Sequence, residues 1–259
     1  MPRALSSAVS GLRNQQTKMD VIGNNVSNVN TVAFKAGRVT FKEGFAQLMS
    51  SSSRPDAATG GTNPVQIGLG SQIGSIDTMF TQGNLETTVN TTDLAIQGNS
   101  FFMLKKGAQS FYTRAGNFRL DATGRLVTQH GELVEPGITV PPDATQLTIG
   151  QDGAVTAIQP GRTDPVNLGQ LELDTFTNPA GLNSIGNNLF TPSAGSGEAV
   201  QAKPGEQGAG TLAQGMLEGA NVKAVEEMID MIACQRAYEL NSKIISTADQ
   251  MLQRLTNIR

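Results

Sequence analysis

The end of the chain is a long stretch that favours a single helix and then needs a partner for it. From Val222 to Ile258 there is neither glycine nor proline, and Asn221 before Glu226 and Glu227 is typical of a helix start. Such a helix would extend roughly 55 Å at about 1.5 Å per residue, well beyond the usual helix of about 11–12 residues. Apolar residues recur along it at spacings of three and four, at Ile244, Ala248, Met251, Leu255 and Ile258. This stripe has to be buried against another helix, because an isolated helix gains little stability of its own.

The beginning of the chain carries a matching pattern. Residues 4–29 show helical periodicity, with an apolar heptad seam at Leu5, Val9, Leu12, Met19 and Val26. Gln16 and Gly23 weaken the same seam. We expect the two terminal helices to pair with each other as a coiled coil, or to pair with the helices of neighbouring copies.

A different kind of polypeptide lies between these helices. Only 38% of the 259 residues are apolar and 16% are charged, against about 45–50% and about 25% in average soluble domains. Glycine, of which there are 29, and small polar residues take their place and cut the middle into short strands. The predicted strands are 94–96, 101–104, 118–120, 126–127, 147–149 and 171–173. Turns are expected at Asp121–Gly124 and at Asp152–Gly153.

Together these patterns predict an α+β protein with an all-β domain inserted between long N- and C-terminal helices. Residues 1–34 plus 218–259 are expected to form a helical coiled-coil core module. Residues 35–70 plus 199–217 are expected to be an extended connector, marked by Ser50–Ser53 and Gly60–Gly61. Residues 71–198 form the predicted β-rich outer domain.

The composition is poor in the residues that carry chemistry. One His and one Cys allow neither an internal disulfide nor a His/Cys zinc site without carboxylates. A net charge of −3 argues against nucleic-acid binding. We therefore expect no enzyme activity, no catalytic residue, no metal, no cofactor and no small-molecule substrate.

Single residues that could suggest a site have simpler interpretations. Cys234 is expected to be a small buried packing residue of the C-terminal helix. His130 precedes a glycine at a predicted turn and is expected to be a surface residue. Glu226, Glu227 and Asp230 could form a carboxylate cluster, but the electrostatics of a helix start explain them more simply.

The sequence shows no targeting signal for secretion or for insertion into a membrane. The first residues lack the continuous apolar run of a signal peptide, and no apolar run long enough to span a membrane occurs. Taken alone this indicates a cytoplasmic protein, and export without a cleavable signal would look the same.

The most distinctive local sequence is the asparagine-rich segment that follows the N-terminal helix. Residues 23–35 resemble the signature Asn-Asn-x-Ala-Asn-x-x-Thr-x-Gly-Phe-Lys of the bacterial flagellar axial family, which contains rod and hook proteins. The matching residues are Asn24, Asn25, Asn28, Thr31, Phe34 and Lys35. The sequence departs at Ser27, where Ala is usual, and at Ala33, where Gly is usual. The second departure disfavours a strict left-handed backbone requirement at position 33.

The C-terminal helix extends the resemblance to nearly the whole chain. Residues 235–243 and 247–252 are similar to the distal-rod branch of the family, and the former segment carries Gln235, Arg236, Tyr238 and Asn241. Residues 176–182 and 210–215 are similar to the same branch. Residues 15–25 and 74–78 are closer to short hook proteins. The length leaves no room for the outer domain of a large hook protein, and residues 44–63 match an extra segment of distal-rod proteins.

The resemblance implies a structural subunit of the distal rod, which polymerises into a hollow helical drive shaft between motor and hook. A short hook protein, forming the flexible joint, is the alternative. An unrelated secreted binding module or wall-degrading enzyme is a third reading. The implied partners are other copies of the chain, proximal-rod and hook axial proteins, the surrounding basal-body rings and the flagellar export apparatus. The implied location is the basal body across the periplasm, reached without a cleavable signal peptide.

Overall fold

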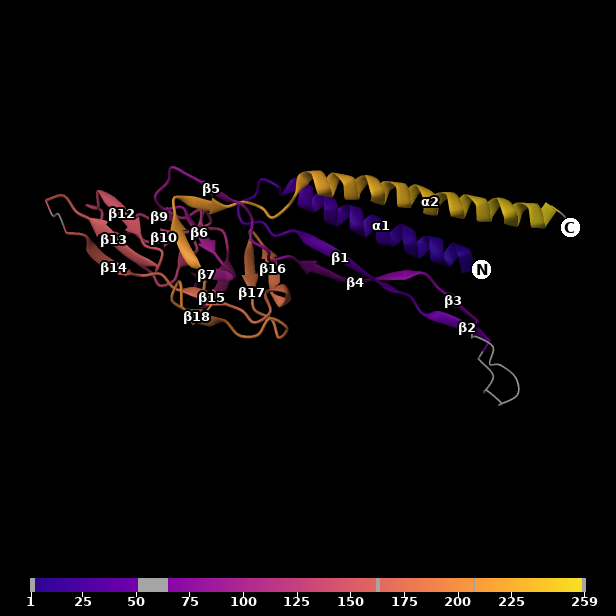
Figure 1. The fold of residues 1–259 in the computed structure, drawn as a ribbon, viewed down its shortest axis with the longest axis horizontal. Coiled ribbons are helices and arrows are strands. Elements are labelled where there is room, and N and C mark those ends of the chain that lie inside the picture. Colours follow the sequence, from indigo (N-terminus) through magenta and orange to yellow (C-terminus); the bar gives the residue numbers. More distant parts are fainter. Residues whose placement is uncertain (1–2, 51–64, 162–163, 207, 258–259) are drawn as a thin grey trace. The chain divides into compact units, whose positions relative to one another are not determined.

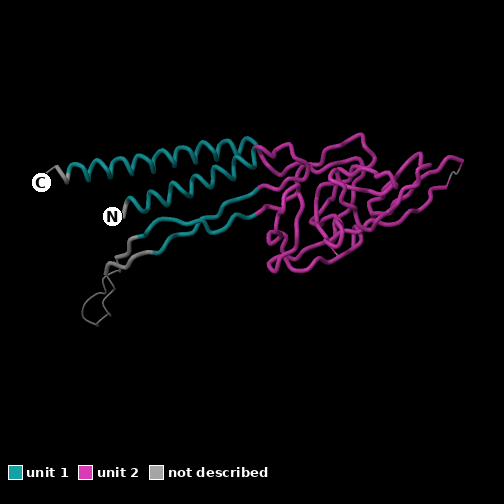
Figure 2. The backbone as a smooth tube through the Cα atoms, turned by 180° about the vertical axis from the view of Figure 1, so that it is seen from behind, with its two compact units in different colours: residues 1–26, 37–77, 224–259 teal, residues 27–36, 78–223 magenta. Residues whose placement is uncertain are grey.

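The computed structural model describes residues 3–50, 65–161, 164–206 and 208–257. The chain divides into two compact units, coloured separately in Figure 2. Unit 1 comprises residues 1–26, 37–77 and 224–259, and unit 2 comprises residues 27–36 and 78–223. The predicted division into three parts stays a prediction about functional domains. It differs from these units in where residues 27–77 and 199–223 belong.

Unit 1 contains the two predicted terminal helices, α1 (Arg3–Ser27) and α2 (Ala224–Asn257). They lie side by side and run antiparallel (Figure 1), with Lys18 Nζ 3.5 Å from Asp230 Oδ1 and Cys234 Sγ 3.1 Å from the Gln15 carbonyl. Both helices form because their sequences combine apolar periodicity with an absence of proline. The prediction of long helices at both ends is thereby confirmed.

The same unit contains paired strands where the sequence suggested an irregular connector. Strands β1 (Gly37–Glu43) and β4 (Ser71–Thr78) form one two-stranded ribbon, and β2 (Ala46–Ser50) and β3 (Val65–Gly68) form another. Asn14 Nδ2 of α1 donates to Ser71 Oγ of β4 at 2.7 Å. Most of the predicted segment 44–63, including Ser51–Ser53 and Gly60–Gly61, lies outside the described residues.

Unit 2 is the predicted all-β domain, built from one large antiparallel sheet and several smaller ones. The large sheet has the order β16-β17-β8-β7-β11-β10-β9, with β15 paired to β7 and β18 paired to β15. A three-stranded sheet β12-β13-β14 and the pairs β19-β6 and β20-β5 complete it. Antiparallel sheets need only short turns between strands, which suits a glycine-rich sequence.

The strands of unit 2 have the following bounds. They are β5 (Leu85–Thr87), β6 (Leu94–Gln97), β7 (Ser100–Lys106), β8 (Gln109–Thr113), β9 (Arg119–Leu120), β10 (Leu126–Val127), β11 (Leu133–Val134), β12 (Gln146–Ile149), β13 (Ala154–Ile158), β14 (Val166–Gln170), β15 (Leu173–Thr175), β16 (Asn183–Gly186), β17 (Leu189–Thr191), β18 (Val200–Ala202), β19 (Thr211–Gln214) and β20 (Met216–Glu218). A short 3₁₀ helix covers Pro179–Gly181.

Most of the predicted strands are present, with two differences. The strand expected at 171–173 begins only at Leu173, because Leu171 is buried in the core without joining a ladder. Residues 199–217, expected as connector, contribute to β18, β19 and β20. Both predicted turns are confirmed: Gly124 and Gly153 have φ of 77° and 82°, values that glycine adopts without steric cost.

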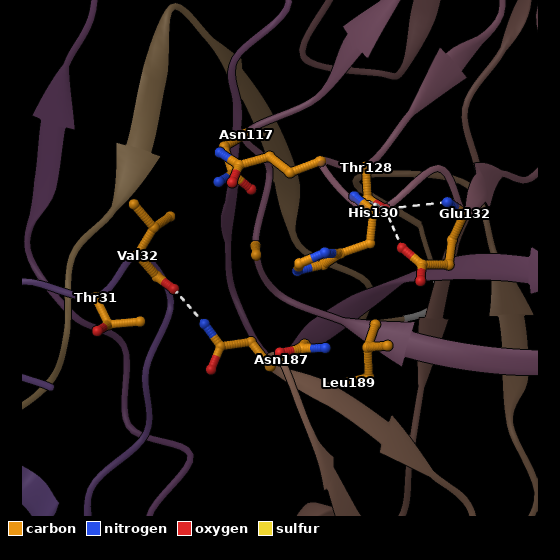
Figure 3. A pocket seen from close by; sticks show the side chains of 11 residues that line it. Thr31, Val32, Asn117, Thr128, His130, Glu132, Asn187 and Leu189 are labelled. Carbon is orange, nitrogen blue, oxygen red and sulfur yellow. Dashed lines mark hydrogen bonds between the residues drawn. The ribbon is translucent and has the colours of Figure 1, made fainter. Parts of the chain in front are cut away.

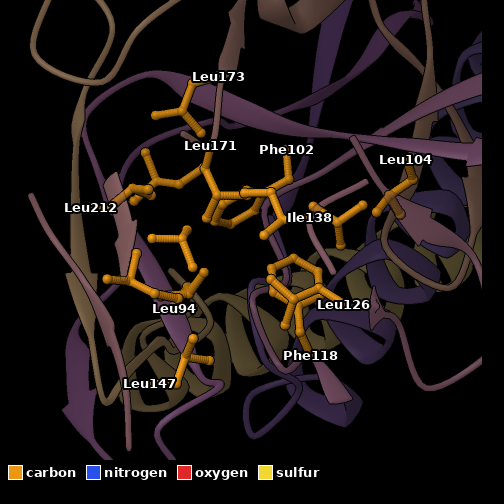
Figure 4. Packing of buried hydrophobic residues seen from close by; sticks show 14 of the residues in the cluster. Leu94, Phe102, Leu104, Phe118, Leu126, Ile138, Leu147, Leu171, Leu173 and Leu212 are labelled. Atoms are coloured by element: carbon orange, nitrogen blue, oxygen red, sulfur yellow. The ribbon is translucent and has the colours of Figure 1, made fainter. Parts of the chain in front are cut away.

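Two apolar clusters form the core of unit 2. The larger cluster includes Leu94, Phe102, Phe118 and Leu171, which converge between the sheets (Figure 4). The smaller cluster contains Phe101, Tyr112, Phe176, Leu182 and Phe190. Its rings meet edge to face, as with Tyr112 and Phe176, whose centroids are 4.9 Å apart.

One backbone conformation in unit 2 corrects the sequence analysis. Ala33 has φ of 56° and is 1% exposed, and its N–H donates to the Glu218 carbonyl at 2.7 Å. The left-handed requirement that Ala33 was expected to relax is therefore present. The expectation was wrong because the requirement comes from a hydrogen bond to a residue far away in sequence.

This conformation predicts how position 33 tolerates substitution. We expect Ala33→Val to lower the free energy of unfolding by about 3 kcal/mol, because a β-branched residue is strained at this φ and the site has no room for it. Ala33→Gly should change it by less than about 1 kcal/mol, since glycine adopts this conformation freely. Urea unfolding followed by circular dichroism measures both, and equal effects of the two variants would contradict the prediction.

A buried carboxyl predicts a pH dependence of stability. Asp174 is 3% exposed, and its Oδ2 has no hydrogen-bond partner among the residues that the structure describes. Burial, helped by the nearby Glu172 carboxylate, raises the pKa of Asp174 to about 6. Because the folded state then holds a proton that the unfolded state releases, the stability that Asp174 provides is complete below pH about 4 and lost as pH rises through 6.

We therefore expect Asp174→Asn to stabilise the protein at pH 8 by about 2 kcal/mol and to have little effect at pH 4. Urea unfolding at the two pH values measures the difference. Glu172→Gln is the matched control, with a smaller effect of the same sign. A benefit of Asp174→Asn that does not change with pH would rule out ionisation as its cause.

Candidate assembly interface

The two terminal helices contact each other along a line of small and polar residues. On α1 the residues in contact are Gly11, Gln15, Lys18 and Asn25, which lie on one helix face. A Cβ at Gly11 would lie 3.0 Å from Asn241 Nδ2 of α2, so the helices approach closely there. Cys234 is 2% exposed on the α2 side, which confirms its predicted packing role. Burial raises the pKa of its thiol.

The apolar seam predicted from the sequence lies beside this line of contact. On α1, Leu5, Leu12, Met19 and Val26 are half-buried and Val9 is 40% exposed. On α2, Ala248 is buried, whereas Ile244 and Met251 are 48% and 57% exposed. The side chain of Leu255 and the whole of Ile258 lie outside what the structure describes.

The rest of α2 exposes further apolar side chains. Val225 is 71% exposed and Ile229 63%. The exposed α2 stripe, as we define it, consists of Val225, Met228, Ile229, Ile232, Leu240, Ile244, Met251 and Leu252. The first four of these were not among the residues predicted for the interface, although their three-and-four spacing was the available signal.

The asparagines of the N-terminal motif hold the end of α1. Asn25 is 2% exposed; its Oδ1 accepts from the Gly37 N–H and its Nδ2 donates to the Gly37 carbonyl, both at 2.9 Å. Nδ2 also donates to Glu227 Oε1 of α2 at 3.0 Å. Asn25 thus joins α1, β1 and α2 within unit 1. Burial raises the pKa of Glu227.

The remaining residues of that motif belong to the turn after α1. Thr31 Oγ1 donates to Asn28 Oδ1 at 3.1 Å, and the Thr31 N–H donates to the Asn28 carbonyl at 3.0 Å. Asn24 is exposed and Phe34 half-buried, and Lys35 is buried beside Glu218. The motif therefore acts as a helix end and anchor.

The residues of the C-terminal motif lie mostly on the surface of α2. Gln235 and Arg236 are exposed, and Arg236 pairs with Glu239 at 3.3 Å. Tyr238 is 40% exposed. Asn241 faces Gly11, as described above.

The pocket around His130 does not have the arrangement of a catalytic site (Figure 3). This pocket of about 260 Å³ is lined by Thr31, Asn117, His130 and Asn187 among others. Glu132 accepts hydrogen bonds from Thr128 and from Lys106, which lower its pKa against the effect of burial. Among the described residues, no hydrogen bond joins the His130 imidazole to a carboxylate or hydroxyl, as a general base would need.

The described parts of the chain also hold no group of three or more His, Cys, Asp or Glu that could bind a metal ion. Of the carboxylates considered above, Glu227 is bonded to Asn25 and Asp230 is paired with Lys18. Neither helix in the described residues is apolar enough over sufficient length to cross a membrane.

Comparison with known proteins gives matches along the whole chain. Residues 5–35 match the family described as flagella basal body rod protein, and residues 95–157 match the D1 domain of flagellar hook protein FlgE/F/G. Residues 213–258 match the C-terminal part of flagellar basal body rod FlgEFG proteins. These ranges cover α1, the centre of unit 2, and α2.

Individual relatives separate rod from hook. The flagellar basal-body rod protein FlgG of Bacillus subtilis is 46% identical over 265 residues, covering 100% of both chains. FlgG of Caulobacter vibrioides is 44% identical over 260 residues, covering 99% of both. The flagellar hook protein FlgE of Borreliella burgdorferi is 54% identical over 127 residues, which is 49% of this chain and 29% of that one. The chain therefore belongs to the flagellar rod and hook family, and within it to the basal-body rod proteins represented by FlgG.

Proposed function

We propose that this chain is the structural subunit of the flagellar distal rod and that its copies polymerise into a hollow helical drive shaft. The shaft transmits torque from the motor to the hook. Full-length relatives named as rod proteins support the assignment to the rod. The observation that carries polymerisation is the exposed α2 stripe.

The exposed α2 stripe has the character of an interface between copies. Single exposed apolar residues are ordinary, but a row of them along one helix is typical of a surface that a partner covers. Each side chain of this size contributes about 1.5–3 kcal/mol when it is fully buried. Contacts between different faces of identical copies generate an open helix when the rotation from one copy to the next does not close into a ring.

A coiled coil between copies accounts for the seam predicted from the sequence. Within one subunit the helices meet through Gly11, Gln15 and Cys234, which leaves Val9, Ile244 and Met251 exposed. We propose that the predicted seam forms the interface between copies. Its residues are Leu5, Val9, Leu12, Met19, Val26, Ile244, Ala248, Met251, Leu255 and Ile258, of which Ala248 is already buried within the subunit.

The remaining partners follow from a place in the shaft. The subunits contact other copies, proximal-rod and hook axial proteins at the two ends, and the surrounding basal-body rings. They reach the periplasm as unfolded chains through the flagellar export apparatus. This function needs no catalytic residue, metal, cofactor, nucleic acid or small-molecule substrate.

A short hook protein is the second candidate. The observation that favours it is the 54% identity to a hook protein. That match covers only 49% of this chain, whereas the identity to rod proteins extends over its full length. The rod is therefore the assignment that the whole sequence supports.

The exposed α2 stripe predicts which surface changes prevent assembly. We expect Ile232→Lys to raise the critical concentration for polymerisation at least about tenfold, because apolar contact is lost and a charge enters the interface. Sedimentation of the purified protein, with electron microscopy of the pellet, measures this.

Ser242→Lys is the matched control, since it places the same side chain at another exposed position of the same helix. We expect it to polymerise like the wild type. Equal polymerisation by Ile232→Lys would rule out the exposed α2 stripe as an interface.

Cells that lack the protein distinguish rod from hook. We expect their basal bodies to end after the proximal rod and to carry no hook, because the distal rod is the platform on which the hook grows. Electron microscopy of isolated basal bodies shows this directly. A complete rod without a hook would instead identify the chain as a hook protein.

A further inference from the structure

Three charged side chains meet in the interior of unit 2, away from every surface discussed above. Lys35 Nζ lies 2.6 Å from Glu218 Oε1, and Arg114 Nε lies 2.9 Å from Glu218 Oε2. The side chains of Lys35 and Glu218 are 0% exposed and that of Arg114 1%. We call these three residues the ion triad.

The ion triad is fully hydrogen-bonded to the backbone around it. Lys35 also donates to the Thr81 carbonyl at 2.8 Å, and Glu218 Oε1 accepts from the Gly83 N–H at 2.9 Å. Arg114 donates to the carbonyls of Ser100 and Gly98 at 3.1 and 2.8 Å. Burial lowers the pKa of Lys35, with the neighbouring Arg114 acting in the same direction and Glu218 opposing. Removing Glu218 would leave two buried cations without compensation, which is strongly destabilising.

The residues bonded in this way come from every segment through which the chain enters and leaves unit 2. Lys35 lies in residues 27–36, which follow α1, and Glu218 ends β20 in the segment that leads to α2. Thr81 and Gly83 follow β4, the strand by which the chain re-enters unit 2. Arg114 belongs to the sheet itself, directly after β8.

A layer of amide hydrogen bonds beside the ion triad keeps the same segments together. The Ala36 N–H donates to Asn221 Oδ1 at 2.7 Å, and Asn221 Nδ2 donates to the Met79 carbonyl at 2.6 Å. The Met79 N–H donates to the Ala36 carbonyl at 2.8 Å. These bonds do not involve the charged side chains, so they can report on the position of the segments independently.

We propose that Lys35, Arg114 and Glu218 are positioning residues that fix, in a single register, the segments attaching the terminal helices to unit 2. Apolar contacts tolerate a slip of one segment along another, whereas a slip here would leave buried charges unpaired. Subunits with slipped segments cannot present their helices uniformly to a growing polymer. This last step rests on the proposed rod function; the fixed register itself does not.

The test separates positioning from stability by replacing all three charges together. The variant Lys35→Met, Arg114→Met, Glu218→Met removes the charges and keeps the volume roughly constant, so its thermal midpoint should stay near that of the wild type. We expect amide hydrogen exchange at Ala33, Met79 and Asn221 to become at least about tenfold faster in the monomer, since these amides report on the register. Exchange at Val155 in β13, the internal control, should not change.

If the three reporter amides of the triple variant exchange as slowly as those of the wild type, the proposal is overturned. The ion triad would then contribute only to the stability of the fold. If the triple variant does not fold, Lys35→Met alone gives the same comparison, since it leaves the Arg114–Glu218 pair intact. Lys35→Arg, which keeps the charge, should restore slow exchange, and failure to do so would contradict the proposal.

Polymerisation provides the functional arm. A variant with accelerated exchange should polymerise with a critical concentration at least about tenfold above that of the wild type. Polymerisation at the wild-type concentration would overturn the link to the rod. If the wild-type protein forms no polymer although its reporter amides exchange slowly, the proposed rod function fails. The fixed register would still hold in that case.

Discussion

The structure depends on one buried carboxylate. Glu218 accepts from Lys35, Arg114 and Gly83, and its own carbonyl accepts from the Ala33 N–H. Each of these bonds is made in a setting without water, where an unpaired charge is costly. The burial of Lys35 and of Arg114 beside Glu218 therefore follows from one requirement. That requirement is to pair the charges that folding brings inside.

Each face of the terminal helices has a different character: one face makes the contact within the subunit, and another leaves apolar side chains exposed. Small and polar residues such as Gly11, Gln15 and Cys234 let α1 and α2 approach closely within one subunit. The larger apolar residues of α2 stay exposed. A subunit that buried all its apolar helix residues between its own two helices would expose few of them for contact with neighbouring copies. This arrangement explains why a chain with only 38% apolar residues can still supply both a β-domain core and a surface suited to assembly.

Sequence patterns predicted local structure well and partners poorly. The long helices were predictable because periodicity and the absence of proline act over neighbouring residues. The same periodicity identified apolar faces but not what covers them, so the predicted seam at Leu12 and Met19 lies beside the observed contact at Gln15 and Lys18. The strand expected at 171–173 was displaced because a short apolar run marks burial without defining which residues join a ladder.

Residue types and short spacings were enough to predict the fold class and the family signature, because both are properties of neighbouring residues. The role of Lys35 depends on the tertiary structure, since its partner Glu218 is 183 residues away. The tertiary structure also decided the conformation of Ala33 and the raised pKa of Asp174. Burial and long-range pairing cause all three, and neither is encoded in any local pattern.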